Sequence, residues 1–421
     1  MTSLSLLLWI VSGIALQLAF YLGVGFWRHW QGYQALRNGT VELNLPVMPA
    51  GASEEEEPVI AAWSGYRTFK VERKVVEDAA QSICSFYLVP EDGLSLPPYL
   101  PGQFLTFRLD VPKVTATEQL LRCYSLSDAP RQDGYRVSVK RVLTPCGSQV
   151  PPGRASSFLH DQVAVGSRLQ VRAPSGHFHL DRSDAPVVLI GGGIGITPML
   201  SMLNWSLSEQ PGREIWLFYG VRNGRELVMR EHLEALAAAH PSFRLRFCFS
   251  DPLPEDMAAR DHRHRGRIDV QLLRMQLPLK PYHYYICGPT PLLESLVPAL
   301  EDWGVPDAHI HFEAFGPASI RLRQSTATAL PSGTPATDIA VTFAQSGKQL
   351  QWQPAAGSLL EFAEANGITA SSGCRAGGCG ICQTTIRSGE VAYRQPPEYD
   401  PEPGTCLLCV CTPKTSVTLE I

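Results

Sequence analysis

Several features are scarce or absent in this sequence, and each absence excludes a class of protein. Charged residues make up only 18% of the chain, the formal net charge is -4, and no dense Lys/Arg stripe occurs, which argues against nucleic acid as a partner. There is no internal repeat, and no Ser-His-Asp order with a nucleophile elbow, so hydrolysis has no support. Hydrophobic residues make up 44% of the chain, which excludes disorder for most of it.

Charge is also missing from the N-terminus, where the first charged side chain is Arg28. The segment from Leu4 to Trp27 is mostly apolar and longer than the roughly 20 residues that cross a bilayer. A signal peptide is the alternative, but the segment has no basic start and no convincing cleavage site. We therefore predict a single transmembrane helix within residues 1–31. The positive charges downstream of it place the remainder on the cytoplasmic side of the inner membrane.

A chain of 421 residues is long enough for two to four domains, at roughly 100 to 200 residues each. Residues 32–66 are irregular and include four consecutive glutamates, which predicts a linker. Short alternating strands over residues 67–183 predict a small antiparallel β-barrel. Alternating strands and helices over residues 184–316 predict an α/β domain with helices on both faces of a parallel sheet. A second linker, 317–337, precedes a last domain over residues 338–421.

Individual elements follow from local patterns. The strands predicted in the barrel are Thr68–Val76, Ile83–Val89, Phe104–Val111, Tyr135–Val142 and Arg168–Ala173. Residues Arg225 to His240 predict a strong amphipathic helix. Ser358 and Glu361 form the pattern of a capping box, which predicts the start of a short helix in the last domain.

Six of the eleven cysteines lie in the last 50 residues, which is uneven for a disulfide framework and suggests metal ligation. The run Cys374-Arg-Ala-Gly-Gly-Cys379-Gly-Ile-Cys382 matches the C-x4-C-x2-C spacing of plant-type 2Fe-2S ligation. Structural zinc is the rival, but zinc sites usually pair two C-x2-C or Cys/His knuckles. Cys409 is our choice of fourth ligand because it follows an apolar pair and precedes the final strand. Cys406 and Cys411 remain alternatives.

A short run in the barrel carries the groups that a flavin nucleotide needs. Arg122-Cys-Tyr124-Ser125 supplies a cation, an aromatic face and a hydroxyl, and on a strand Arg122 and Tyr124 share one face. Gly153-Arg-Ala155-Ser156 stands before an apolar helix start, where backbone N–H groups bind pyrophosphate. The two runs together predict a flavin site.

A glycine run, Gly191-Gly-Gly-Ile-Gly195-Ile-Thr197-Pro198, follows a strand and opens a helix, as a dinucleotide phosphate loop does. A Rossmann dehydrogenase is disfavoured because the G-x-G-x-x-G pattern fails at Ile196. No acidic residue at the end of the next strand is placed to hold ribose hydroxyls. Cys287-Gly-Pro follows a later strand; a small buried residue is the structural alternative for this cysteine.

In series, these motifs resemble the oxygenase-reductase branch of the ferredoxin-NADP reductase superfamily, and the last domain resembles a plant-type ferredoxin of β-grasp (α+β) fold. The resemblance covers about residues 67 to 421 and implies FAD, NADH or NADPH, and a 2Fe-2S cluster. It assigns catalytic positions to Ser125, Cys287 and Phe315. It assigns flavin binding to Arg122, Tyr124, Ser125, Val139, Lys140, Gly153, Ala155 and Ser156. It assigns nucleotide binding to Gly192, Gly193, Gly195, Thr197, Pro198, Cys287, Gly288 and Pro289. It assigns the cluster to Cys374, Cys379, Cys382 and Cys409.

The implied function is a membrane-anchored NAD(P)H reductase that feeds a partner oxygenase, hydroxylase or desaturase. Arg222 would suit the 2′-phosphate of NADPH, whereas the resemblance to oxygenase reductases favours NADH. Two alternatives remain: a dehydrogenase that passes electrons to quinone, and a redox sensor whose modules bind without turnover. For a nitric oxide dioxygenase of the flavohaemoglobin type, a globin module would be expected where this sequence has the apolar segment.

Overall fold

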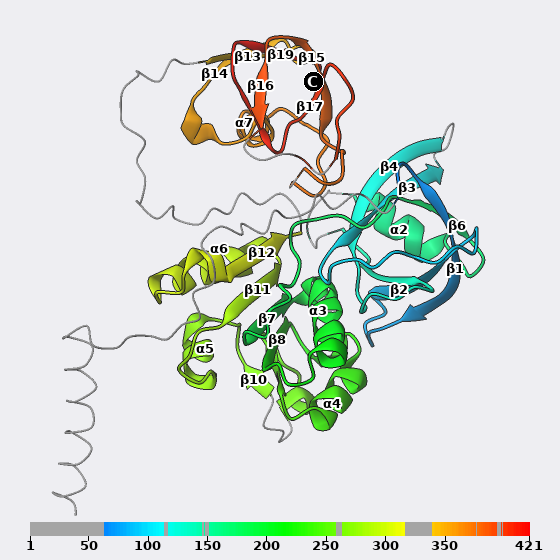
Figure 1. Cartoon of the computed structure of the whole chain (residues 1–421), viewed down its shortest axis with the longest axis vertical. Helices are drawn as coiled ribbons and strands as arrows, with labels where there is room; N and C mark the ends of the chain where they lie inside the picture. Colours follow the sequence, from blue (N-terminus) through cyan, green and yellow to red (C-terminus); the bar gives the residue numbers. More distant parts are fainter. Residues whose placement is uncertain are drawn as a thin grey trace, which may run out of the picture. The chain divides into compact units, whose positions relative to one another are not determined.

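The computed structural model describes residues 63–112, 117–144, 147, 151–257, 263–315, 339–375, 377–393, 397 and 399–421. The predicted anchor over residues 1–31 and the linker 317–337 lie outside these ranges, as does the first linker up to residue 62. Among the helices that are described, none has the length and apolar character needed to cross a bilayer. The chain from Ile60 to Ile421 forms one unit, and it contains three successive domains (Figure 1).

The flavin domain is the antiparallel sheet that the sequence predicts. Its elements are β1 (Arg67–Val76), β2 (Ile83–Pro90), β3 (Phe104–Pro112), β4 (Thr117–Ser125), β5 (Tyr135–Lys140), α2 (Arg154–Asp161) and β6 (Arg168–Val171). The strand order is β4-β3-β6-β1-β2-β5. The sheet curls, because a bridge between Leu126 and Val137 brings the end of β4 to β5. Strand β4 is an addition to the predicted set: its two adjacent leucines hide the alternation of a strand, but it pairs with β3 along its whole length.

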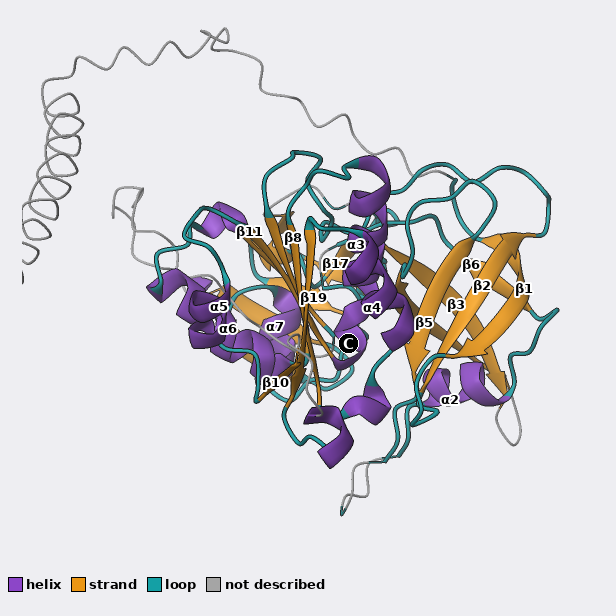
Figure 2. Ribbon diagram, turned by 90° about the horizontal axis from the view of Figure 1, so that it is seen from below, coloured by secondary structure: helices purple, strands orange, loops and turns teal. Residues whose placement is uncertain are grey.

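The nucleotide domain has a six-stranded parallel sheet. Its elements are β7 (Val187–Gly192), α3 (Ile196–Glu209), β8 (Ile215–Val221), α4 (Arg230–Ala239), β9 (Phe243–Phe249), β10 (Arg263–Arg265), α5 (Val270–Gln276), β11 (His283–Gly288), α6 (Thr290–Asp302) and β12 (Ile310–Ala314). The order is β10-β9-β8-β7-β11-β12. Helices α3 and α4 cover one face and α5 and α6 the other (Figure 2). Two separate buried clusters result, one containing Leu200 and Leu233 and the other Leu273 and Leu296. The prediction of helices on both faces is therefore confirmed.

The helix predicted over Arg225–His240 is shorter than the amphipathic pattern indicates. Gly224–Glu226 form a single 3-10 turn, and α4 begins only at Arg230. Between them Leu227 and Val228 are buried in the core, and Met229 has a φ of 50°. Leu227 has extended backbone and Met229 lies in the left-handed region, so the helix cannot run through these residues and tertiary packing overrides the helical pattern.

The last domain has a mixed sheet with one helix packed on it. Its elements are β13 (Ile339–Phe343), β14 (Lys348–Trp352), α7 (Leu359–Ala365), β15 (Gln383–Ser388), β16 (Val391–Tyr393), β17 (Thr405–Leu407), β18 (Cys411–Pro413) and β19 (Val417–Leu419). Five strands follow the order β14-β13-β19-β15-β17, and β16 pairs with β18. The predicted capping box is present, since the Ser358 side chain accepts from Glu361 N–H and the Glu361 carboxylate accepts from Ser358 N–H. Phe362 of α7 packs on Phe343 with ring centroids 6.1 Å apart.

Candidate active site

The flavin-binding residues predicted on β4 lie at its C-terminal half. Tyr124 packs edge-on against Phe107 of β3, with ring centroids 5.6 Å apart, and burial raises the pKa of its phenol. Arg122 is exposed two residues earlier. Ser125 ends the strand and is buried. The strand thus presents an exposed cation that donates to the Leu121 carbonyl oxygen, an aromatic side chain packed on β3 and a buried hydroxyl.

The predicted pyrophosphate loop forms the N-terminus of α2. Gly153 is the N-cap, no side chain caps the helix, and its first turn contains no acidic residue. Such an end leaves backbone N–H groups and the positive end of the helix dipole available to an anion. Arg154 in this first turn forms an ion pair with Glu118 of β4, which brings the loop to the same side of the sheet as the β4 residues. The loop and the predicted β4 residues therefore belong to the same strand region, with the ion pair at the start of β4 and Tyr124 near its end.

Val139 and Lys140, at the end of β5, differ in what they can offer. The Val139 side chain is 1% exposed and belongs to the barrel core, and its carbonyl oxygen hydrogen-bonds His160 Nε2 at 2.9 Å. The Val139 side chain therefore packs in the barrel core, where it supports the fold of the flavin domain. Lys140 Nζ lies 3.9 Å from the Glu226 carboxylate, so its charge faces the nucleotide domain.

The predicted nicotinamide residues come together where β7 and β11 end. Gly192 closes β7, Gly193 and Gly195 form a 3-10 turn, and Thr197 and Pro198 are buried in the first turn of α3. The turn packs so tightly on the next motif that a Cβ at Gly195 would overlap the carbonyl oxygen of Cys287. Glycine is required here because two backbone segments touch.

Cys287, Gly288 and Pro289 lead from β11 into α6. Cys287 is fully buried, and burial raises the pKa of its thiol, with the nearby Glu313 adding to the effect. A neutral thiol is therefore favoured over a reactive thiolate. A buried neutral thiol is better suited to contact a nicotinamide ring than to act as a nucleophile.

Glu313 lies at this place as well, although the sequence analysis assigned it no role. It lies on β12 directly beside Cys287 of β11 in the parallel register, and its side chain hydrogen-bonds Ser125. The pKa of this carboxyl is raised to about 8, chiefly by burial and also by Cys374, while the Ser125 hydrogen bond opposes the rise. Glu313 Oε2 is buried without a hydrogen-bond partner. An acidic residue inside a short apolar strand was the signal available in the sequence.

The hydroxyl of Ser125, the thiol of Cys287 and the carboxyl of Glu313 thus meet beside Cys374. Phe315, the predicted aromatic neighbour of the flavin, lies two residues beyond Glu313, and 37% of its surface is exposed. We call these five residues the junction. An exposed ring next to buried polar groups is an arrangement that fits a planar aromatic cofactor.

The four predicted cluster cysteines lie close together in two pairs. Cys382 and Cys409 have their sulfur atoms 3.2 Å apart. Cys379 Sγ accepts a hydrogen bond of 3.3 Å from Cys374 N–H, and the Cys374 thiol also contacts Cys409. In the described residues, no three His, Cys, Asp or Glu side chains are arranged as a ligand set for a single metal ion. Four thiols in two pairs fit a 2Fe-2S cluster, which takes four thiolate ligands.

Cys406 and Cys411, the alternative fourth ligands, occupy a different place. Both are fully buried in the hydrophobic core of the last domain. Their side chains contact each other, and that contact and burial raise the pKa of Cys411. The geometry therefore favours Cys409, the partly exposed member of the three, as the fourth ligand.

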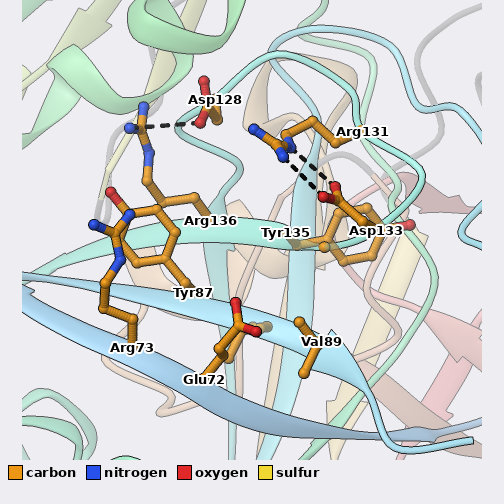
Figure 3. Close-up of a pocket in the computed structure, with 11 residues that line it drawn as sticks. Glu72, Arg73, Tyr87, Val89, Asp128, Arg131, Asp133, Tyr135 and Arg136 are labelled. Atoms are coloured by element: carbon orange, nitrogen blue, oxygen red, sulfur yellow. Dashed lines mark hydrogen bonds and ion pairs between the residues drawn. The ribbon is translucent and has the colours of Figure 1, made fainter. Parts of the chain in front are cut away.

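A pocket in the flavin domain is not part of this site. Figure 3 shows a pocket of about 410 Å³ lined by residues that include Tyr87, Arg131 and Arg136. Arg131 donates two hydrogen bonds to Asp133, and Arg136 pairs with Asp128 at 3.5 Å. None of the predicted site residues lines the pocket. Two of its three arginines are paired with carboxylates and the third, Arg73, lies over the Tyr87 ring, so the pocket is a poor site for a cofactor phosphate.

Arg222, the residue that would suit a 2′-phosphate, is paired in the structure. Its Nε donates to the Glu226 carboxylate at 2.5 Å. Glu226 is mostly buried, whereas the Arg222 side chain is 73% exposed. A carboxylate at this position repels the 2′-phosphate of NADPH. It also offers an acceptor to ribose hydroxyls, as the acidic residue of a Rossmann-type site does.

Comparison with known protein families finds three matches in order along the chain. The oxidoreductase FAD-binding domain matches residues 69–180, and the oxidoreductase NAD-binding domain matches residues 189–297. The 2Fe-2S iron-sulfur cluster binding domain matches residues 341–414. The candidate flavin, nicotinamide and cluster residues fall within these ranges, apart from Phe315, which lies beyond the second.

Three relatives place the chain more closely. A flavohemoprotein of Bacillus cereus is 36% identical over 290 residues, which are 69% of each chain. The FAD/NAD-binding domain of nitric oxide dioxygenase from Vibrio cholerae is 33% identical with a TM-score of 0.53, and covers 60% of this chain and 100% of that one. Phthalate dioxygenase reductase, a modular structure for electron transfer from pyridine nucleotides to [2Fe-2S], is 27% identical with a TM-score of 0.51, and covers 85% of this chain and 98% of that one.

The relatives that match over the first two domains share the FAD- and NAD-binding parts, and the one that matches over all three shares the iron-sulfur part as well. The chain therefore belongs to the ferredoxin-NADP reductase-like oxidoreductases and combines an FAD-binding, an NAD-binding and a 2Fe-2S domain as an electron-transfer enzyme.

Proposed function

We propose that this NAD(P)H-FAD-2Fe-2S reductase delivers single electrons to a partner oxygenase, hydroxylase or desaturase. The observation that carries the proposal is the junction, where residues of the flavin strand, the nicotinamide strand and the cluster loop meet. Similarity to phthalate dioxygenase reductase across all three domains supports an oxygenase as the class of acceptor.

FAD would supply the change from two-electron to one-electron chemistry, and the cluster would hold one electron at a time. The overall reaction balances: one NAD(P)H and two oxidised acceptors give NAD(P)+, one proton and two reduced acceptors. Within this reaction Cys287 and Thr197 would position the nicotinamide ring. Glu313, neutral at pH 7 because of its raised pKa, would hold a proton next to the flavin-binding hydroxyl of Ser125.

We also propose NADH as the preferred donor, because Glu226 pairs with Arg222 and places a negative charge near the expected ribose. Substituting Glu226→Gln removes that charge and the ion pair with Arg222, so the site repels a 2′-phosphate less strongly. The ratio of kcat/KM for NADPH to that for NADH should rise about tenfold. Steady-state kinetics with both nucleotides measure the ratio, and an unchanged ratio would exclude this account of nucleotide choice.

The N-terminal segment from Leu4 to Trp27 supports a membrane location, with the three domains at the cytoplasmic face. The full-length protein should float with lipid vesicles and resist extraction at high salt. Placing a charge in the middle of the segment, as in Ile14→Arg, should release it, because a charged residue at the centre of a membrane helix costs several kcal/mol. Release of the unmodified protein by salt alone would contradict the anchor.

The acceptor class is tested by comparing a ferric acceptor protein with short-chain quinone under the same NADH supply. The proposal expects fast reduction of the ferric acceptor and slow reduction of quinone. Fast quinone turnover at micromolar concentration would instead favour the membrane dehydrogenase. Failure of NADH to bleach the flavin band would favour a redox sensor.

A further inference from the structure

The flavin domain touches the cluster loop through a small set of side chains that no assigned role explains. The thiol of Cys123, on β4 between Arg122 and Tyr124, contacts the sulfur of Cys379. Ser175 donates a hydrogen bond of 3.4 Å to the carbonyl oxygen of Gly378. We call these contacts the seam. They bring the flavin-binding strand directly against a predicted cluster ligand.

Arg172 occupies the seam between two aromatic rings. Its guanidinium lies 4.5 Å from the ring centroid of Tyr399 in the last domain and 5.5 Å from that of Tyr66 in the flavin domain. Within the described residues, no carboxylate forms an ion pair with Arg172. Its backbone N–H donates to the Thr106 carbonyl oxygen at 2.9 Å, so the residue is fixed to the end of β6 beside β3.

Tyr399 is fixed to the cluster loop in turn. Its backbone N–H donates to the Gly377 carbonyl oxygen at 3.0 Å. Its ring packs so closely on Gly380 that a Cβ there would overlap the ring, and Gly380 has a φ of 73°. Any movement of Tyr399 therefore moves the loop that carries Cys379 and Cys382.

The other polar contacts of the seam are weak ones. A hydrogen bond of 3.4 Å and a thiol-thiol contact contribute little, and domains joined by small interfaces move relative to one another by default. A guanidinium stacked on a tyrosine face supplies a stronger attraction that is insensitive to the exact angle. The contact between Arg172 and Tyr399 involves no carboxylate. Separation of the flavin domain from the last domain therefore leaves no anion without a partner.

We propose that Arg172 is a positioning residue for internal electron transfer, which holds the cluster loop against β4 through its cation-π contact with Tyr399. The proposal rests on the proposed function, since it concerns the step from flavin to cluster. When the contact is made, one residue, Cys123, separates the flavin-binding side chains of β4 from the ligand Cys379. When it is lost, the loop is free to move away and the single-electron step slows.

The test uses the holoenzyme with its flavin and cluster, mixed rapidly with NADH in the absence of oxygen. Flavin bleaching and cluster reduction are followed separately by absorption. Arg172→Met and Tyr399→Leu should each slow cluster reduction about tenfold while flavin bleaching keeps its wild-type rate. Arg172→Lys and Tyr399→Phe, which keep a cation and a ring, should recover most of the rate.

Arg73→Met is the matched control. Arg73 lies 3.6 Å from the Tyr87 ring centroid, so the substitution removes a cation-π contact of the same domain that lies outside the seam. It should leave cluster reduction unchanged. Equal slowing by Arg73→Met and Arg172→Met would mean that the effect is a general loss of stability, and it would overturn the proposal.

A second readout does not depend on turnover. Hydrogen exchange should increase in Arg172→Met for the peptides that contain Ser175 and Gly378, and remain unchanged in the nucleotide domain. Wild-type exchange at the seam together with wild-type cluster reduction would refute the positioning role. That result would leave the proposed function intact, whereas absence of cluster reduction in the unmodified holoenzyme would refute the function itself.

Discussion

The carboxyl of Glu313 is buried between a flavin-binding serine and a cluster cysteine, which is an unusual environment for an acid. Its neighbours are Ser125, Cys287 and Cys374, and its pKa is raised to about 8, chiefly by burial. A neutral acid in such a place can donate a hydrogen bond or a proton where a carboxylate can only accept. We therefore expect Glu313 to affect the reaction as well as the packing.

Glu313→Ala should lower the rate of flavin reduction by NADH about tenfold, because it removes the hydrogen-bond partner of Ser125 beside the predicted flavin site. Glu313→Gln, which keeps the hydrogen-bond donor, should lose less. Rapid mixing without oxygen measures both rates. Asp307→Ala, which removes a carboxylate from the other end of β12, is the control and should behave as wild type. Wild-type rates in Glu313→Ala would exclude a role at the junction.

The fourth cluster ligand is a second question at the scale of one residue. Cys409→Ala should abolish the visible absorption of the cluster, because one of two iron atoms loses a thiolate. Cys406→Ala should keep the cluster and lower the free energy of unfolding by roughly 1 to 3 kcal/mol, since it opens a small cavity in a packed core. Absorption spectra and denaturant unfolding distinguish the two. Loss of the cluster in Cys406→Ala alone would reverse the assignment.

At the scale of elements, histidines crowd the N-terminal ends of β11 and β12. The rings of His283 and His309 stack with centroids 4.2 Å apart, and the His311 ring stacks on Tyr285 at 4.5 Å. The pKa of His311 is lowered to about 4, chiefly by burial and also by His283, His309 and His179, while Asp181 opposes the fall. The folded protein therefore disfavours a proton that the unfolded chain accepts.

This arrangement makes stability depend on pH in a definite direction. The pKa of His311 falls from about 6.5 in the unfolded chain to about 4 in the folded one, so the unfolded state binds more protons between these values. Stability should be full above pH 7 and fall by roughly 2 to 3 kcal/mol as the pH drops from 6.5 to 4. Unfolding by urea at a series of pH values measures the loss.

His311→Phe keeps a ring against Tyr285 and removes the titrating group, so its stability should depend less on pH over the same range. His240→Phe, at the end of α4, is the control and should keep the wild-type slope. If both variants retained the full acid sensitivity, another group would be responsible.

The elements also explain what could be predicted from the sequence. The cysteine run and the glycine run are local, because their chemistry depends on spacing within one loop, and both lie where the sequence analysis placed them. The prediction of one helix over Arg225–His240 was wrong in its first part, because the packing of the core and not the local periodicity determines the burial of Leu227 and Val228. Strand β4 was not among the predicted strands, because its pairing with β3 determines its conformation and its own residue pattern does not alternate.

At the scale of the whole molecule, the residues that connect the domains were the hardest to predict. Glu313 acquires its role from the register that sets β12 beside β11. Cys123, to which the sequence analysis gave no role, contacts a loop more than 250 positions later. Such pairings arise from tertiary structure, so a single sequence contains no direct signal for them. The predicted anchor and linkers lie outside the described residues and remain predictions.

The order of the domains implies an order of electron flow. NAD(P)H binds in the second domain, the flavin site lies in the first, and the cluster site in the third. The junction and the seam are the two places where these domains exchange contacts that bear on chemistry. The central claim is therefore that electrons from one nucleotide pass through both cofactors of the same chain.

An anaerobic titration of the holoenzyme with NADH tests that claim most directly. A flavin that takes two electrons and a cluster that takes one predict complete bleaching at about 1.5 NADH per chain, with the flavin and cluster bands both lost. Bleaching that ends at about one NADH per chain with the cluster still oxidised would contradict the account.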